Sequence, residues 1–205
     1  VSKDEFTINV RNWKKKNGDK SLRLDYPSLS ENSIVFDVGG YLGDFAHEIH
    51  MKYGCKVYIF EPHPVFFEKC NQRFADNINI TTLNYGLSDI SGKFKLTDSV
   101  DGSSFLNLKG KDTVICEVRN IFDVLKNLKI NNIDLMKVNI EGGEYPLLQH
   151  IADKNSLDIV NFYQIQFHNF IEEAEKKRQK ILIALNRSHT NTWCYKFVWE
   201  SWERK

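Results

Sequence analysis

Two apolar stretches of the sequence each end in an acidic side chain that could bind a ligand. Residues 34–43 read IVFDVGGYLG, so Asp37 is followed almost directly by glycines. Residues 56–64 read KVYIFEPHP, so Glu61 closes the second stretch. Glycines let the backbone turn sharply and let a ligand approach it closely. A helix that follows such a turn presents unpaired N–H groups to a carboxylate or phosphate. This pattern predicts a small-ligand site at two strand ends.

The glycine spacing indicates the kind of ligand. The dinucleotide-binding pattern GxGxxG would need two more glycines after Gly39, at the positions of Tyr41 and Asp44. The spacing present is DxGxxxG, which runs from Asp37 to Gly43. Its acid can meet an ammonium group or the water around it. A zwitterionic, positively charged ligand therefore fits this stretch better than a pyrophosphate does, although a purely structural turn is the alternative.

Glu61 lies where the ribose of a bound nucleoside is expected. A carboxylate there can accept hydrogen bonds from both ribose hydroxyls, a contact worth roughly 1.5 to 3 kcal/mol. The alternative is that Glu61 only balances the dipole of a helix that starts near Pro64. A third stretch, residues 79–83, is followed by residues 84–88, NYGLS. In this segment Gly86 and Leu87 could frame an adenine ring. A plain loop is the alternative there.

Strands and helices that alternate along the chain would position these residues. We expect strands at residues 33–38, 56–60, 79–83, 133–140 and 157–167, and helices at 44–52, 64–77, 120–128, 145–152 and 171–186. Shorter strands are expected at 94–96 and 114–118, and one antiparallel or edge strand within residues 193–202, WCYKFVWESW. This order predicts an α/β fold, a doubly wound and mostly parallel sheet. Ligands of such sheets bind beyond the carboxyl ends of the strands.

The composition limits the partners and the location of the protein. With 28 basic and 27 acidic residues the net charge is +1, so no overall field attracts nucleic acid or an anionic membrane. The four cysteines have no CxxC spacing and are expected to be buried free thiols, which is typical of a reducing compartment. No apolar run reaches the roughly 18 to 20 residues of a membrane span. We expect one cytoplasmic domain, with residues 1–32 as an N-terminal extension and 33–205 as the α/β core.

Several blocks of the sequence resemble the FkbM-type S-adenosylmethionine-dependent methyltransferases. The resemblance runs from Val35 to His150, through the blocks VFDVGGYLGDF, FEPHP, NYGLSD, DGSSF and DLMKVNIEGGEYPLL. It implies the Rossmann-like class I methyltransferase sandwich, S-adenosylmethionine as the cofactor and a hydroxyl acceptor. The acceptor would be a sugar of a surface glycan or a secondary metabolite. The residues expected to bind the cofactor are Asp37, Gly39, Gly40, Tyr41, Gly43, Glu61, Pro62, Gly86 and Leu87.

The resemblance has two departures. Where the family commonly has Asp, this chain has Asn139, whose amide can position a hydroxyl but cannot take its proton at neutral pH. The family usually has an antiparallel pair among its later strands, whereas one C-terminal strand is expected here, so the sheet would be shortened. Ser103 and Ser104 match the family's serines and could border the donor or the acceptor.

The chemistry of an O-methyltransferase would lie at the ends of the fourth and fifth strands. His168 is the first candidate base, because an unperturbed imidazole has a pKa near 6.5. Glu141 is the alternative base if burial raises its pKa, and Asn139 is the third candidate catalytic residue. The alternative is that His168 caps a strand end and that Glu141 and Glu144 cap a helix. Lys137 lies within a strand and needs a partner, for which Glu144 or Asp134 is expected.

Other activities stay open on the sequence alone. Glu141, Asn139 and His168 could instead bind magnesium or manganese, but the sequence shows no cluster of three carboxylates, so we expect no metal. An NAD-binding oxidoreductase would use a similar fold, but the glycine pattern argues against it. A methyltransferase-like subunit that binds the donor without catalysis is kept open by Asn139. The acceptor and the oligomeric state are not predicted.

Overall fold

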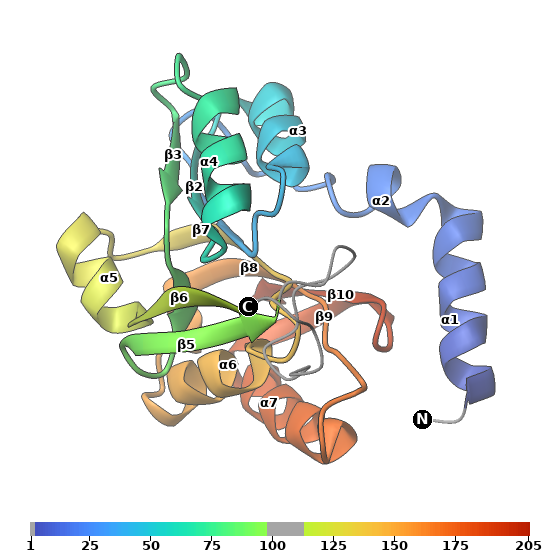
Figure 1. Ribbon diagram of the computed structural model, residues 1–205. Helices are drawn as coiled ribbons and strands as arrows, with labels where there is room; N and C mark the ends of the chain where they lie inside the picture. Colours follow the sequence, from blue (N-terminus) through green and yellow to red (C-terminus); the bar gives the residue numbers. More distant parts are fainter. Residues whose placement is uncertain (1–2, 98–112) are drawn as a thin grey trace.

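The computed structural model describes residues 3–97 and 113–205. These residues form a central seven-stranded sheet and a smaller three-stranded sheet (Figure 1). Five strands of the central sheet are parallel: β1 (Ile34–Val38), β2 (Lys56–Phe60), β3 (Ile80–Leu83), β7 (Ile133–Val138) and β8 (Val160–Ile165). The strand order is β3-β2-β1-β7-β8-β10-β9, so the chain changes direction across the sheet between β1 and β7. Ligands of such sheets bind at this switch point.

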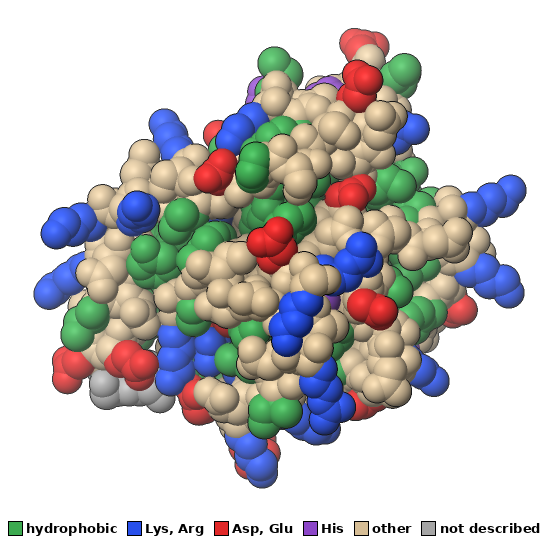
Figure 2. Space-filling model, turned by 180° about the vertical axis from the view of Figure 1, so that it is seen from behind, with side chains coloured by type: hydrophobic (Ala, Val, Ile, Leu, Met, Phe, Trp, Pro, Cys, Tyr) green, Lys and Arg blue, Asp and Glu red, His purple; other side chains and the backbone are tan. Residues whose placement is uncertain are grey.

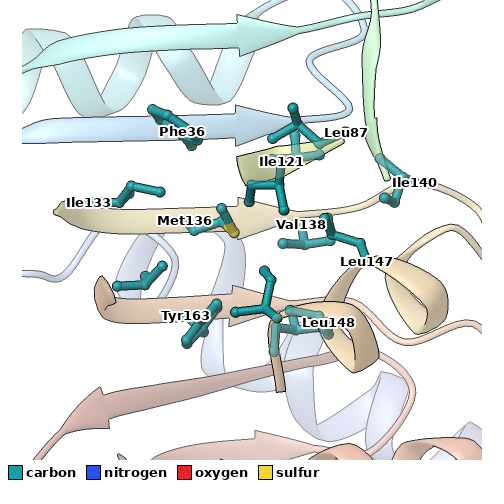
Figure 3. Close-up of a cluster of buried hydrophobic side chains, with 14 of the residues drawn as sticks. Phe36, Leu87, Ile121, Ile133, Met136, Val138, Ile140, Leu147, Leu148 and Tyr163 are labelled. Atoms are coloured by element: carbon teal, nitrogen blue, oxygen red, sulfur yellow. The ribbon is translucent and has the colours of Figure 1, made fainter. Parts of the chain in front are cut away.

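Helices cover both faces of the central sheet. They are α3 (Asp44–Tyr53), α4 (Pro64–Arg73), α5 (Ile121–Leu128), α6 (Glu144–Asp153) and α7 (Ala174–Ser188). Successive residues of a strand point to opposite faces. Accordingly, Val35 packs with side chains of α3 and α4, whereas Phe36 belongs to the larger cluster with α5, α6 and α7. Figure 3 shows part of that larger cluster, in which side chains of β1, β7 and β8 lie beside those of α6. Burial on both faces explains why these strands read as nearly continuous apolar runs.

Local sequence signals set the ends of the helices beside the switch point. α4 begins with Pro64, a residue whose fixed φ suits the first turn, and the side chain of His63 accepts a hydrogen bond from the N–H of Val65. α3 ends at Tyr53 and is followed by the C-cap residue Gly54, which has a left-handed backbone with φ of 69°. At their other ends, α3 begins at Asp44, directly after Gly43, and α4 begins at Pro64, shortly after β2.

The small sheet has the order β4-β6-β5 and includes a strand that the sequence did not predict. β5 (Gly92–Thr97) and β6 (Thr113–Asn120) extend the expected short strands. β4 (Gly86–Ser88) was expected to be part of a loop, but it pairs with β6 in parallel. A strand of three residues is too short to show an alternating pattern. β4 also packs against α6, so the small sheet lies next to the central one.

The C-terminal region contains two strands where the sequence predicted one. β9 (His189–Tyr195) and β10 (Trp199–Arg204) form a hairpin, and β10 lies antiparallel between β8 and β9. The turn contains Phe197 with φ of 60°, and the N–H of Val198 donates to the carbonyl of Tyr195 at 2.7 Å. The expected α/β fold with a mostly parallel sheet is confirmed, whereas its expected shortening is wrong. Phe197 in the turn continues the alternating pattern of the two strands, so the sequence does not reveal where β9 ends and β10 begins.

Residues before the sheet pack against this hairpin. α1 (Lys3–Lys16) and the short α2 (Gly18–Ser21) precede β1. The buried ring of Trp13 lies 5.6 Å from Trp193 and 5.2 Å from Tyr195, measured between ring centroids. Trp193 and Tyr195 therefore serve in packing the N-terminal helices against the hairpin. Among the described residues, no helix is long and apolar enough to cross a membrane.

Candidate functional site

The glycine-rich bend after β1 has backbone conformations and close contacts that require glycine. Gly39 has φ of 84°, and a Cβ atom there would lie 1.9 Å from the carbonyl oxygen of Asn139. A Cβ atom on Gly40 would lie 2.1 Å from the side chain of Ile59. Tyr41, which has φ of 51°, is half exposed at the tip of the bend. The backbone is thus bare of side chains next to the switch point.

Glu61 lies directly against this bend. Its Oε2 atom accepts a hydrogen bond from the N–H of Tyr41 at 2.8 Å, and its Oε1 atom accepts one from the N–H of His63 at 2.9 Å. Burial raises the pKa of Glu61 to about 7, although the two backbone donors act in the opposite direction. The neighbouring Pro62 is also buried, and a Cβ atom on Gly86 would lie 3.6 Å from its ring. The ends of β1 and β2 and the start of β4 therefore meet.

A buried ion pair between Lys137 and Asp37 stabilises the glycine-rich bend. Lys137 Nζ donates to Asp37 Oδ1 at 2.8 Å and to the carbonyl of Gly39 at 2.6 Å. Both side chains are almost completely buried, and burial lowers the pKa of Lys137. The sequence predicted Glu144 or Asp134 as the partner of Lys137, and this prediction is wrong. Asp37 and Lys137 are paired residues of β1 and β7, a relationship that sequence spacing does not reveal.

One oxygen of this pair is left without a partner among the described residues. Asp37 Oδ2 is buried and accepts no hydrogen bond. It lies next to Gly40, since a Cβ atom on that residue would be 3.8 Å from it. A buried acceptor of this kind is rare in native structures unless a ligand or water satisfies it. The bend, Glu61 and Asp37 thus supply a bare backbone and carboxylate acceptors at one place.

His168 forms a compact cluster with two carboxylates. The backbone N–H of His168 donates to Glu144 Oε1 at 2.8 Å, and the imidazole Nδ1 lies 3.1 Å from the same oxygen. Its Nε2 lies 3.4 Å from Glu141 Oε1. Burial works against the charged imidazole, but the two carboxylates outweigh it and raise the pKa of His168 to about 9. This pKa is higher than the ordinary value near 6.5, which was the reason for ranking His168 as the first candidate base.

Glu141 and Glu144 also shape the loop that joins β7 to α6. Glu141 has φ of 50°, and Glu144, which is fully buried, accepts from the N–H of Gly142 at 2.7 Å. Tyr145 is a residue that the sequence reasoning missed. Its hydroxyl donates to the carbonyl of His168 at 2.7 Å. Its position directly after the EGGE segment was the only available signal.

The other predicted site residues lie at the end of β7, against the core or outside the described residues. Asn139 extends the pairing of β7 with β1, and its buried Oδ1 has no partner among the described residues. Gly43 faces Phe74 of the core, since a Cβ atom would lie 2.5 Å from its ring. Leu87 is buried in the larger core cluster. Ser103 and Ser104 lie outside the described residues.

No cluster that could hold a metal ion is present in residues 3–97 and 113–205. The carboxylates nearest to the switch point are instead bonded to Lys137, to backbone N–H groups or to His168. The candidate donor site and the His168 cluster both lie after strands of the parallel sheet. Asn139 lies between them in the chain and contacts the bend through its carbonyl.

Comparisons with known proteins bear on the family and the fold of this chain. The model of the methyltransferase FkbM domain matches residues 37–191. The methyltransferase sdnD of Sordaria araneosa is 26% identical over 168 residues, which cover 64% of this chain and 65% of that protein. This chain therefore spans slightly less than two thirds of that relative's length.

Solved structures resemble the fold. An rRNA methylase from Streptococcus thermophilus superposes with a TM-score of 0.51 at 15% identity, over 87% of this chain and 90% of that one. Fibrillarin in its complex with Nop5p superposes with a TM-score of 0.51 at 12% identity, over 86% of this chain and 75% of that one. At these identities the likeness concerns the fold alone.

Proposed function

Because the chain belongs to the FkbM family of S-adenosylmethionine-dependent methyltransferases, we propose that it methylates the oxygen of a hydroxyl group on a small molecule or glycan. The observation that carries the donor site is the contact between Glu61 and the glycine bend. When bound, S-adenosylmethionine supplies an activated methyl group on a positively charged sulfur. The residues around the bend then have to bind and orient the donor.

The described side chains fit such a donor. Asp37 Oδ2 is a buried acceptor that has no partner in residues 3–97 and 113–205, which suits the ammonium group of an amino acid or the water around it. Each oxygen of Glu61 already accepts one backbone hydrogen bond, but a carboxylate oxygen has a second acceptor site. Glu61 can therefore accept from ribose hydroxyls without giving up its contact with the bend. Gly39 and Gly40 let the ligand approach the backbone.

The His168 cluster is proposed to handle the acceptor. Methylation of a hydroxyl requires that its proton leaves, and a nearby base can take it. With a pKa of about 9, His168 is mostly protonated at neutral pH and only about 1% is available as a base. Glu141 is bonded to the same imidazole and is one-third exposed, so it is the alternative base. Asn139 would position the hydroxyl through its amide oxygen, which accepts no hydrogen bond from the described part of the chain.

RNA as the acceptor has no specific support in the net charge or in the face of the molecule that Figure 2 shows. Some structural neighbours are RNA methylases, but their likeness extends only to the fold. The net charge is +1, and on the face in Figure 2 basic and acidic side chains are interspersed. Proteins that bind nucleic acid without base recognition usually gather Lys and Arg on one face.

Two measurements test this proposal. Calorimetric titration with S-adenosylhomocysteine and with NAD should show binding of the first only, and binding of NAD alone would favour an oxidoreductase. Transfer of a radiolabelled methyl group to a panel of hydroxylated acceptors should then yield an ether product. Donor binding with no transfer to any acceptor would favour the non-catalytic subunit. The same assay in EDTA should keep its activity, and loss with rescue by magnesium would favour the metal site.

A further inference from the structure

A large apolar cavity lies between the small sheet and the helices α6 and α7. Its volume is about 610 Å³. Leu87, Phe94 and Val118 of the small sheet form one side, and Tyr145 of α6 and Ile181 of α7 form the other. A cavity of this size falls in the range of pockets that hold small organic ligands. None of the residues in the glycine bend, nor Glu61, is among its described lining residues.

The cavity is connected to the His168 cluster. Gly142 and Gly143, in the loop between Glu141 and Glu144, are part of its wall. Tyr145 also lines the cavity, and its hydroxyl donates to the carbonyl of His168 at 2.7 Å. A molecule in the cavity would therefore contact the loop that carries Glu141, the alternative base, and would lie next to Tyr145, which bonds to His168.

The charged side chains at the cavity are both positive. Lys177 and Lys180 of α7 are among the lining residues, and their spacing of three places them on one side of the helix. No Asp or Glu occurs among the described lining residues. Neither lysine forms an ion pair in the part of the chain that the structure describes. Lys177 and Lys180 thus place positive charge next to the apolar wall of the cavity.

We propose that this cavity binds the methyl acceptor and that the acceptor is a lipophilic anion, an apolar body that carries the hydroxyl group to be methylated and, apart from it, a carboxylate, sulfate or phosphate group. This inference rests on the proposed function. The apolar body would fill the space between Phe94 and Ile181, and the anionic group would face Lys177 and Lys180. A bare sugar fits this wall poorly, because buried hydroxyls without hydrogen-bond partners are unfavourable. Of the two acceptor classes that the sequence left open, a sugar of a surface glycan or a secondary metabolite, the apolar lining favours the secondary metabolite.

A binding experiment can test the cavity without turnover. The probe is 1-anilinonaphthalene-8-sulfonate, an apolar anion whose fluorescence rises in apolar surroundings, titrated into the full chain. Lys177→Gln with Lys180→Gln should weaken its binding by about 5- to 30-fold, as expected for two partly exposed ion pairs. Lys14→Gln with Lys15→Gln changes the net charge equally on α1 and should leave binding unchanged. Equal weakening in both double variants would overturn the proposal.

A second pair of variants tests the apolar part. Gln149 lines the cavity from α6, and its side chain donates a hydrogen bond to Asp153 four residues later. Gln149→Trp should fill the space and reduce probe binding at least about tenfold, which corresponds to 1.4 kcal/mol. Gln72→Trp is the matched control, because Gln72 makes the same kind of contact with Glu68 on the exposed side of α4. Unchanged binding in Gln149→Trp would overturn the site.

Competition and donor binding separate this inference from the proposed function. Decanoate should displace the probe at lower concentration than decanol, and glucose should not displace it. Equal displacement by decanol would overturn the anionic part, and displacement by glucose would favour a sugar. The affinity for S-adenosylhomocysteine should be the same in all four variants. If the unmodified chain binds the probe but not S-adenosylhomocysteine, the proposed function fails while the cavity remains a binding site.

Discussion

The backbone N–H of Tyr41 donates a 2.8 Å hydrogen bond to Glu61 Oε2, which fastens the bend after β1 to the end of β2. The two residues are 20 positions apart in the chain. Two sequence blocks that were each weak signals for a ligand are thus parts of one wall. The same carboxylate also bonds to the N–H of His63 at the start of α4. The predictions for donor binding follow from this contact.

Replacement of Glu61 should weaken donor binding. Glu61→Ala removes the carboxylate that is proposed to accept from ribose hydroxyls, so the affinity for S-adenosylhomocysteine should fall by about 1.5 to 3 kcal/mol. Calorimetric titration at pH 8 measures this change, and circular dichroism checks that the fold persists. An unchanged affinity in a folded Glu61→Ala protein would remove the ribose assignment.

Donor affinity should rise with pH up to about pH 7. Burial raises the pKa of Glu61 to about 7 in the free protein, and ribose hydroxyls bind its ionised form better. Binding then lowers the pKa of Glu61 and releases a proton, so affinity is lost as the pH falls below 7 and is constant above it. The loss is at most about tenfold per pH unit. Titrations at pH 6 and pH 8 should differ for the unmodified chain and agree for Glu61→Gln.

His168 should control the maximal rate rather than donor binding. His168→Ala should lower kcat by roughly 10² to 10⁴ if the imidazole is the base. Because its pKa is raised to about 9, the neutral form accumulates only at high pH, and kcat should rise with pH through about 9. Glu141→Gln removes one of the carboxylates that raise this pKa, so the rise should move to lower pH. A pH profile that Glu141→Gln leaves in place would exclude His168 as the titrating group.

The strands next to the switch point were predictable because burial on both faces leaves a clear apolar run. The predicted strand at residues 56–60 agrees with β2, Lys56–Phe60. The pairing of Asp37 with Lys137 was not predictable, because it depends on the register between strands 100 residues apart. The raised pKa of His168 was missed for a similar reason. It depends on the left-handed turn at Glu141, which brings that carboxylate back to the imidazole.

The buried pair of Lys137 and Asp37 should be important for stability. Lys137→Met leaves Asp37 as an unpaired buried charge and should reduce the free energy of unfolding by about 3 to 5 kcal/mol. Adding Asp37→Asn should recover part of that loss, since the uncompensated charge is then gone. Urea unfolding followed by fluorescence measures both variants. Lys176→Met removes a lysine from the exposed pair with Glu173 and should leave the unfolding free energy unchanged. Equal effects of the two Lys→Met changes would contradict the importance of the buried pair.

Gly39 should tolerate no side chain. An alanine there would have to keep φ of 84°, and its Cβ would lie 1.9 Å from the carbonyl oxygen of Asn139, so the bend has to move away from β7. That movement also breaks the bond from Lys137 to the carbonyl of Gly39. Gly39→Ala should therefore lower the unfolding free energy by at least about 2 kcal/mol and reduce the affinity for S-adenosylhomocysteine. Gly92→Ala is the matched control, because a Cβ at that position meets nothing within 4 Å, and it should be neutral in both measurements. Full donor affinity in Gly39→Ala would mean that the bend does not form the donor site, since no ligand pose could be indifferent to its displacement.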